Sequence, residues 1–448
     1  MTSNIKSFSV YGLFGTNDVH IPFDEDVKIL IGENGIGKTQ VLSMFYYTLM
    51  GDFRSLLQFA FEKLEIVFLR NIIKISKSDL NTLSLEYSSI LELVERYGME
   101  KVIEFRNLEH ADVSEKLTNN IFLKEIFTKK VDFFDNVYKN NAYFSRLPKK
   151  ITILLQNFDK NKRILIQQLS EEIIFLPTFR RIEFDLHNLG YDTKDIELNK
   201  ENILIQFGMR DVGERFEKIE EDIENLLKNG LSDFTKNILE IVAEINPKIA
   251  NDAVFDKINE EDLDIIFARV GNGLEQNVKD TIKEAVKTKQ FKNPFAGFLL
   301  QKLIEIYEKQ KTLDNSIKAF RDVCNGYLIN KKVFYDESAI KIYLKSDATN
   351  AEIELSKLSS GEKQIISIFS KIYLSEAEKR FIVLFDEPEL SLSVFWQKKL
   401  LPDIMKSKKC NFLLAVTHSP FIFDNDLDKY AIGLNEYIKP ANQVPVAL

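Results

Sequence analysis

A chain of 448 residues is too long for one ordinary hydrophobic core, so we expect two domains or one domain with a large insertion. The net charge of −8 argues against a generally basic nucleic-acid-binding surface. The sequence shows neither a signal peptide nor the run of roughly 18 apolar residues that a membrane helix needs, so we expect a cytoplasmic protein. Its two cysteines, Cys324 and Cys410, are too isolated for a disulfide or a zinc site.

Residues 29–40 read ILIGENGIGKTQ and fit the pattern G-x-x-x-x-G-K-[ST] between an apolar run that predicts a strand and one that predicts a helix. In this context backbone N–H groups, the helix N-terminus and the lysine converge on phosphates, and the threonine hydroxyl can bind Mg²⁺. We therefore expect a nucleotide to bind here. Its expected contacts are Gly32, Asn34, Gly35, Gly37, Lys38, Thr39 and Gln40.

A segment from Glu171 to Leu186, EEIIFLPTFRRIEFDL, predicts a strand that is broken by Pro177 and followed by Arg180 and Arg181. The two arginines could bind a phosphate or an acidic partner. An edge strand with two exposed arginines is an equally good interpretation. The Lys-rich stretches 146–150 and 160–163 could line a nucleic-acid groove, although such stretches are more often a solvated face.

The middle of the chain predicts helices, because apolar residues recur every three or four positions over 209–226, 231–245 and 299–324. Gly230 is expected to end the first helix, and Asn246 with Pro247 to end the second. The third pattern is interrupted by Gln310. These helices predict a bundle or a short antiparallel arm. Their apolar stripe can be intramolecular core or an oligomer seam.

Three further motifs follow in the last quarter of the chain. Residues 357–374 predict a helix that begins in the small-residue turn Ser359, Ser360 and Gly361. Residues 381–392, FIVLFDEPELSL, predict a buried parallel strand that ends in Asp386, which can hold Mg²⁺, and Glu387, which can act as a general base toward water. Residues 411–421 predict a neighbouring strand that ends at Thr417 and His418, from which the imidazole can reach a γ-phosphate.

The motifs in this order resemble those of the ATP-binding-cassette (ABC) ATPases. Their individual residues are similar to the motifs of the SMC, RecF and OLD-type branch. The resemblance implies an α/β P-loop ATPase head in two parts, residues 1–80 and 331–448, around a mainly helical insertion at 81–330. A strand near 172–177 is expected to return to the head.

The same resemblance implies the cofactors ATP and Mg²⁺ and assigns roles to individual residues. Glu387, His418 and Lys38 would carry out ATP hydrolysis, and Thr39 and Asp386 would hold Mg²⁺. Ser359, Ser360 and Gly361 would bind the γ-phosphate on the P-loop of a second copy, so the ATP sites would be composite and the protein a homo-oligomer.

The sequence also departs from the family pattern. The signature L-S-G-G-Q appears with Ser360 and Glu362 at its third and fifth positions, Ser393-Val394 stand where OLD-like chains have His-Pro, and the transporter D-loop aspartate is missing. We therefore expect slow hydrolysis. Gln58, Gln167 and Gln168 are all candidates for the Q-loop glutamine.

The run L-P-T-x-R-R-I-E is similar to that of defence ATPases in this branch, notably the ATPase subunit of the PARIS-type anti-phage system. We expect an ATPase sensor or scaffold subunit of a defence system that answers a phage-encoded trigger and controls a separately encoded effector. Only 30 residues follow His418, too few for the Toprim nuclease domain of OLD proteins, so a nuclease would be a separate chain. The main alternative is a RecF-like ATP-dependent DNA clamp. The long insertion and the missing aspartate count against a transporter motor, and no membrane partner is expected.

Overall fold

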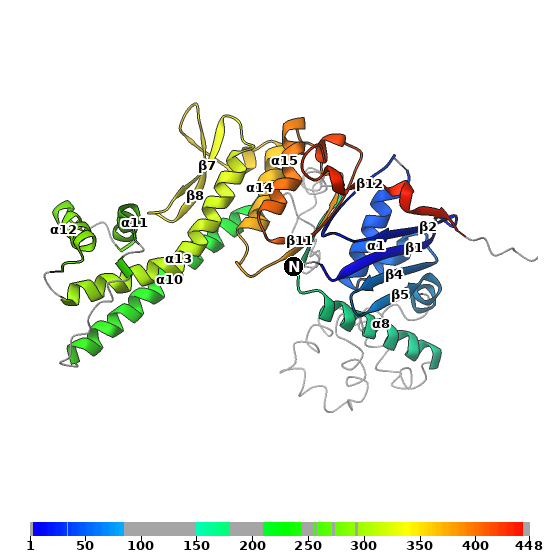
Figure 1. Cartoon of the computed structure of the whole chain (residues 1–448), viewed down its shortest axis with the longest axis horizontal. Coiled ribbons are helices and arrows are strands. Elements are labelled where there is room, and N and C mark those ends of the chain that lie inside the picture. The colour runs from blue at the N-terminus through cyan, green and yellow to red at the C-terminus, as the bar shows by residue number, and fades with distance from the viewer. Residues whose placement is uncertain are drawn as a thin grey trace, which may run out of the picture. The chain divides into compact units, whose positions relative to one another are not determined.

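The computed structural model describes residues 3–33, 35–84, 149–178, 209–243, 254–255, 258–270, 274–291 and 294–441. The chain divides into two compact units. The first unit comprises Met1–Thr178, Arg380–Leu390 and Cys410–Leu448, and the second comprises Phe179–Lys379 and Ser391–Lys409. Figure 1 labels elements of both units, among them α1 of the first and α13 of the second.

Two five-stranded sheets form the first unit, with helix α1 (Lys38–Met50) packed against both. The antiparallel sheet has the order β13-β2-β1-β4-β5, with β1 Ile5–Leu13, β2 Asn17–Pro22, β4 Lys63–Phe68, β5 Ile72–Ser76 and β13 Ile438–Pro440. The parallel sheet has the order β12-β3-β11-β10-β6, with β3 Val27–Ile31, β6 Glu172–Leu176, β10 Phe381–Asp386, β11 Cys410–Thr417 and β12 Ala431–Gly433. Short 3-10 helices are η1 Ser55–Gln58, η4 Pro420–Ile422, η5 Asp428–Tyr430 and η6 Leu434–Tyr437.

The parallel sheet confirms the α/β fold expected from the apolar runs. All six residues of β10 are buried, as an unalternating run predicts for a strand covered on both faces. Strands β10 and β11 are parallel neighbours, with Leu384 opposite Leu414. Helix α1 joins the two sheets through Phe45, whose ring centroid lies 5.0 Å from that of Phe8 and 6.2 Å from that of Phe412.

Helix α8 (Lys149–Gln168) and strand β6 belong to the first unit, although residues 81–330 were expected to form an insertion. Strand β6 is the strand expected near 172–177, and it pairs in parallel with β10. On α8, the ring of Phe158 lies 5.2 Å from that of Phe53. The units therefore divide the chain at places other than residues 80 and 330, because hydrogen bonding to β10 and apolar packing tie 149–178 to the first unit.

Over its described residues, the second unit is mainly helical, with one small sheet. Its elements are α10 Arg210–Ala243, α11 Glu260–Val270, α12 Gln276–Thr288, α13 Pro294–Asn325, β7 Lys331–Asp336, β8 Lys341–Ser346, β9 Glu352–Ile353, η3 Leu355–Lys357, α14 Ser360–Tyr373 and α15 Val394–Lys406. Strands β7, β8 and β9 pair in that order as an antiparallel sheet.

Helix α10 runs without interruption through Gly230, so the helix end predicted there is wrong. The glycine instead allows close packing, because a Cβ atom at Gly230 would lie only 2.5 Å from Cγ1 of Ile306 on α13. The apolar stripe of α10 packs on the same helix: the ring of Phe216 lies 5.5 Å from that of Phe320. At Phe216 and Phe320, therefore, the apolar stripe is intramolecular core. Ile245 lies outside the described residues.

We expect Gly230→Ala to lower the free energy of unfolding by about 1–3 kcal/mol, because the added methyl group forces α10 and α13 apart. Gly213 is a matched control, since it lies in the same helix and a Cβ atom there would meet nothing within 4 Å. Gly213→Ala should be neutral or stabilise by up to about 1 kcal/mol. Urea unfolding measures both changes, and equal effects would contradict the packing role of Gly230.

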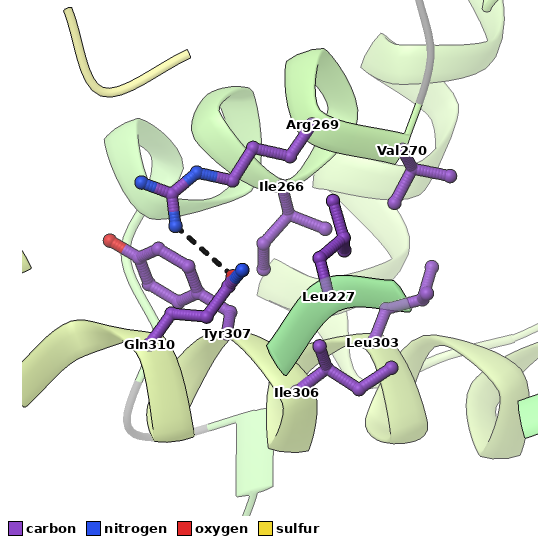
Figure 2. Close-up of a pocket in the computed structure, with 8 residues that line it drawn as sticks. All are labelled: Leu227, Ile266, Arg269, Val270, Leu303, Ile306, Tyr307 and Gln310. Carbon is purple, nitrogen blue, oxygen red and sulfur yellow. Dashed lines mark hydrogen bonds between the residues drawn. The ribbon is translucent and has the colours of Figure 1, made fainter. Parts of the chain in front are cut away.

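A small cavity of about 10 Å³, which suffices for at most one water, lies between α10, α11 and α13 (Figure 2). Its lining residues are Leu227, Ile266, Arg269, Val270, Leu303, Ile306, Tyr307 and Gln310. Gln310, the polar interruption of the apolar pattern, is 1% exposed. Its Nε2 donates to the Ile223 carbonyl at 2.9 Å, and its Oε1 accepts from Arg269 at 3.0 Å. The glutamine therefore links α13 to both α10 and α11.

The two cysteines are buried on α13 and β11. Burial raises the pKa of both thiols, and that of Cys410 reaches about 12. None of the helices within the described ranges is long and apolar enough to cross a membrane.

Candidate functional site

The glycine-rich loop lies between β3 and α1, in the strand and helix context that the motif requires. Gly35 and Gly37 have positive φ angles of 88° and 100°, which favour glycine. The loop leads directly into Lys38, the first residue of α1. The Lys38 side chain is buried, and its Nζ donates to the carbonyl oxygens of Gly32 at 2.6 Å and Glu33 at 3.0 Å. The ammonium group is thus held at the loop itself, where phosphates are expected.

On the first turn of α1, Thr39 is exposed and Gln40 is half-buried, whereas Asn34 lies outside the described residues. The Thr39 hydroxyl donates to Oδ1 of Asp386 at 3.1 Å. Asp386 ends β10 and is fully buried, and its Oδ2 accepts from the hydroxyl of Thr178. These hydroxyl and carboxylate oxygens fit Mg²⁺, which proteins usually hold through one or two carboxylates together with substrate phosphates.

Thr178 reaches this site because β6 is a direct neighbour of β10, so the residues that follow β6 lie beside the end of β10. The motifs did not single out this threonine, and the available signal was the L-P-T run at a strand end. Arg180 and Arg181 of the same run lie outside the described residues. The Q-loop candidates Gln58, Gln167 and Gln168 lie in η1 and at the end of α8, and none of the three follows a strand of this sheet.

Glu387 has a φ angle of 46°, a left-handed conformation that is costly for a residue with a side chain. Its backbone N–H donates to the carbonyl of Val416 at 2.9 Å, and this bond to β11 fixes the conformation. The carboxylate reaches the next strand end, where its Oε1 lies 3.6 Å from Nδ1 of His418. The side chain is therefore held at the carboxyl edge of the sheet, where a general base could act on water.

His418 follows β11, and its side chain is 48% exposed. The nearest carboxylate is Glu389, whose Oε1 lies 3.1 Å from the imidazole Nδ1. Glu389 is only 7% exposed and also accepts hydrogen bonds from the loop that carries the histidine. The motifs did not single out Glu389 either. The available signal was the third acidic residue of the run Asp386-Glu387-Pro388-Glu389.

The signature turn lies in the second unit, where Ser359 is the N-cap of α14. Its hydroxyl accepts from the Glu362 N–H at 3.4 Å, and the Glu362 carboxylate accepts from the Ser359 N–H at 2.8 Å. Lys331 donates to the same carboxylate at 2.8 Å. Burial by itself raises the pKa of Glu362. The hydrogen bonds from Lys331 and Ser359 outweigh burial and lower this pKa below its usual value. This capping box explains a glutamate at the fifth signature position.

Gly361 is required by close packing, because a Cβ atom there would lie 2.5 Å from the carbonyl oxygen of Ser391 and 3.1 Å from the Trp396 ring. Ser359 and Ser360 remain exposed at the helix N-terminus. The signature turn is therefore held by a capping box and close packing, and its two serines are accessible. Lys38, Asp386, Glu387 and His418 belong to the first unit.

Comparisons with known proteins agree with a nucleotide-handling role. A family model described as AAA ATPase domain matches residues 4–423. The curated "Retron Ec83 probable ATPase" of Escherichia coli is 26% identical over 164 residues, and the match covers 30% of this chain and 30% of that relative's length.

Two solved structures give low similarity scores. One is an Smc head bound to the C-terminal winged-helix domain of ScpA, with a TM-score of 0.35, 11% identity, and coverage of 93% of this chain and 90% of that chain. The other is an Smc head domain with an extended coiled coil bound to the C-terminal domain of ScpA from Pyrococcus furiosus, with a TM-score of 0.33, 12% identity, and coverage of 94% and 90%.

Proposed function

Because this chain belongs to the AAA ATPase domain family, we propose that it couples ATP binding and hydrolysis to the association of its own copies. The observation that carries the proposal is that the nucleotide motifs form two well-defined groups of residues, one within each unit. The phosphate loop, Asp386, Glu387 and His418 lie in the first unit, and the exposed signature turn lies in the second.

The first group of residues supports hydrolysis. Phosphate oxygens of ATP would replace the Gly32 and Glu33 carbonyls as acceptors of the Lys38 ammonium group. Thr39 and Asp386 would hold Mg²⁺, which when bound neutralises charge on the phosphates. The Glu387 carboxylate would accept a proton from the attacking water, and His418 would contact the γ-phosphate.

The second group of residues supports association. Helix α14 has 14 residues and presents its N-terminal N–H groups and positive dipole end beside the exposed Ser359 and Ser360. We propose that this turn binds the γ-phosphate held by the P-loop of a second copy. ATP would then close a dimer or larger homo-oligomer, and hydrolysis would reopen it.

At the level of the cell, we propose a sensor or scaffold subunit of an anti-phage defence system that responds to a phage-encoded trigger. Its effector would be encoded separately and would be a Toprim-type nuclease. The amino-acid sequences of the motifs, which resemble those of the SMC, RecF and OLD-like branch, support this role. The likeness to the probable ATPase of a retron supports it too. The narrower PARIS-type assignment rests on the run at 176–183 alone, most of which lies outside the described residues.

The test is the mass of the Glu387→Gln protein in solution with Mg²⁺ and either ATP or ADP. We expect a dimer or larger assembly with ATP and a monomer with ADP. The double variant Lys38→Ala, Glu387→Gln is the matched control and should remain monomeric with both nucleotides. A monomer at saturating ATP would refute the composite-site mechanism. ATP-dependent, salt-sensitive binding to duplex DNA would favour the DNA-clamp alternative over the defence scaffold.

A further inference from the structure

We propose that Glu389 is a positioning residue for ATP hydrolysis, because its buried carboxylate fixes both the backbone and the imidazole orientation of His418. The inference rests on the proposed contact between His418 and the γ-phosphate. It adds a residue that no motif assigned, and it separates the tasks of two neighbouring glutamates.

The first part of the argument concerns the loop that follows β11. Glu389 Oε2 accepts from the Thr417 hydroxyl at 2.8 Å, and Oε1 accepts from the backbone N–H groups of His418 at 3.1 Å and Ser419 at 3.2 Å. The Thr417 hydroxyl in turn accepts from the Ser419 N–H at 3.0 Å. One carboxylate, 7% exposed, thus fixes three consecutive residues. Charge-assisted bonds of this kind are stronger than neutral ones, so the position of the His418 Cα atom is well defined.

The second part concerns the ring. Nδ1 of His418 lies 3.1 Å from Oε1 of Glu389, and it lies 3.6 Å from Oε1 of Glu387, which is too long for a hydrogen bond. The imidazole Nδ1 thus faces the Glu389 carboxylate at ion-pair distance, and a carboxylate oxygen at this place favours the tautomer with a proton on Nδ1. Nε2 is then the nitrogen that remains for the γ-phosphate. With protons on both ring nitrogens, Nε2 donates to a phosphate oxygen there.

The two glutamates therefore have different tasks. Glu389 holds and orients His418, much as a buried carboxylate orients the histidine of a hydrolytic triad. Glu387 acts on water. The competing view is that Glu389 only closes the loop after β11. That view predicts that Glu389→Gln lowers kcat by the same factor whether or not the His418 imidazole is present.

A double-mutant cycle over Glu389→Gln and His418→Ala separates these views. Glutamine keeps the size of the side chain, can still accept from the two backbone N–H groups through Oε1, and can donate to the Thr417 hydroxyl, so the loop should persist while the charge is lost. We expect Glu389→Gln to lower kcat by roughly 10- to 100-fold, the range typical of removing a carboxylate that orients a metal-bound histidine. The KM for ATP should change by less than about threefold, and in the His418→Ala background the same substitution should change kcat by less than about twofold.

A spectroscopic readout accompanies the cycle, since the chain has only four histidines. The ¹⁵N ring signals of His418, assigned by their loss in His418→Ala, should shift in Glu389→Gln. Those of His20, whose Nδ1 lies 2.8 Å from Ser9 Oγ, should not. Glu25→Gln, which removes an exposed carboxylate in the same unit, should leave both the signals and kcat unchanged.

The outcomes distinguish this inference from the function on which it rests. If His418→Ala leaves kcat unchanged, the proposed role of His418 fails and the inference fails with it. If His418→Ala lowers kcat but Glu389→Gln does not, only the inference fails. If Glu389→Gln lowers kcat by the same factor in both backgrounds, Glu389 acts on the loop alone and the inference is overturned.

Discussion

Replacing Glu387 by glutamine should lower ATP turnover by about 100-fold or more, because the amide cannot accept a proton from the attacking water. ATP binding should persist, since the phosphate loop and Lys38 are unchanged. Steady-state phosphate release gives the rate, and equilibrium binding of ATP gives the affinity. Glu25→Gln serves as the control, as an exposed carboxylate outside the site.

The expectation for Glu387 rests on its backbone as well as its side chain. A φ angle of 46° in a residue with a side chain costs on the order of 1–3 kcal/mol, and here the bond from its N–H to Val416 on β11 retains it. Strain of this kind is common where a side chain must be held in one place for function. Turnover that stays within about threefold of wild type would show that another group supplies the base.

The largest expected effect on stability is that of Arg269→Met, which should lower the free energy of unfolding by about 3–5 kcal/mol. The Arg269 guanidinium donates to Asp314 at 2.8 and 3.1 Å, and both side chains are 1% exposed. A further bond reaches the carbonyl of Glu337 at 2.9 Å. Methionine fills a similar volume but leaves the Asp314 charge buried and uncompensated, and this imbalance is the source of the loss.

The matched control for this variant is Arg210→Met, in an ion pair with Glu214 whose side chains are 91% and 61% exposed. Exposed pairs contribute little, so the control should change stability by less than about 1 kcal/mol. Urea unfolding with a common m value measures both variants. Equal losses would show that the buried pair in the second unit contributes no more than an exposed one.

Local sequence patterns predicted the elements that carry the site. The apolar runs before Lys38, before Glu387 and before His418 became β3, β10 and β11, because strands buried on both faces need continuous apolar residues. The capped start of α14 at Ser359 was predicted from the small-residue turn Ser359, Ser360 and Gly361, whereas the capping role of Glu362 was not.

Contacts between distant segments were not predictable in this way. Thr178 meets Asp386 only because β6 pairs with β10, and strand order is a tertiary property. The link between Glu389 and His418 likewise depends on β10 and β11 being neighbours. Gly230 resembled a helix end because glycine commonly stops helices, and only the position of Ile306 on α13 reveals its packing role.

The central claim, that the ATP site is completed by a second copy, is tested most directly by mixing two inactive variants. Lys38→Ala removes the ammonium group that we propose binds phosphate, and Gly361→Asp places a charged side chain where even a Cβ atom would lie 2.5 Å from the Ser391 carbonyl. Each variant alone should lack ATP turnover, but a mixed dimer contains one site with an intact loop and an intact signature. We predict that turnover returns on mixing, with a maximum near equal amounts of the two. Turnover that stays at the sum of the separate variants at every ratio would contradict the account.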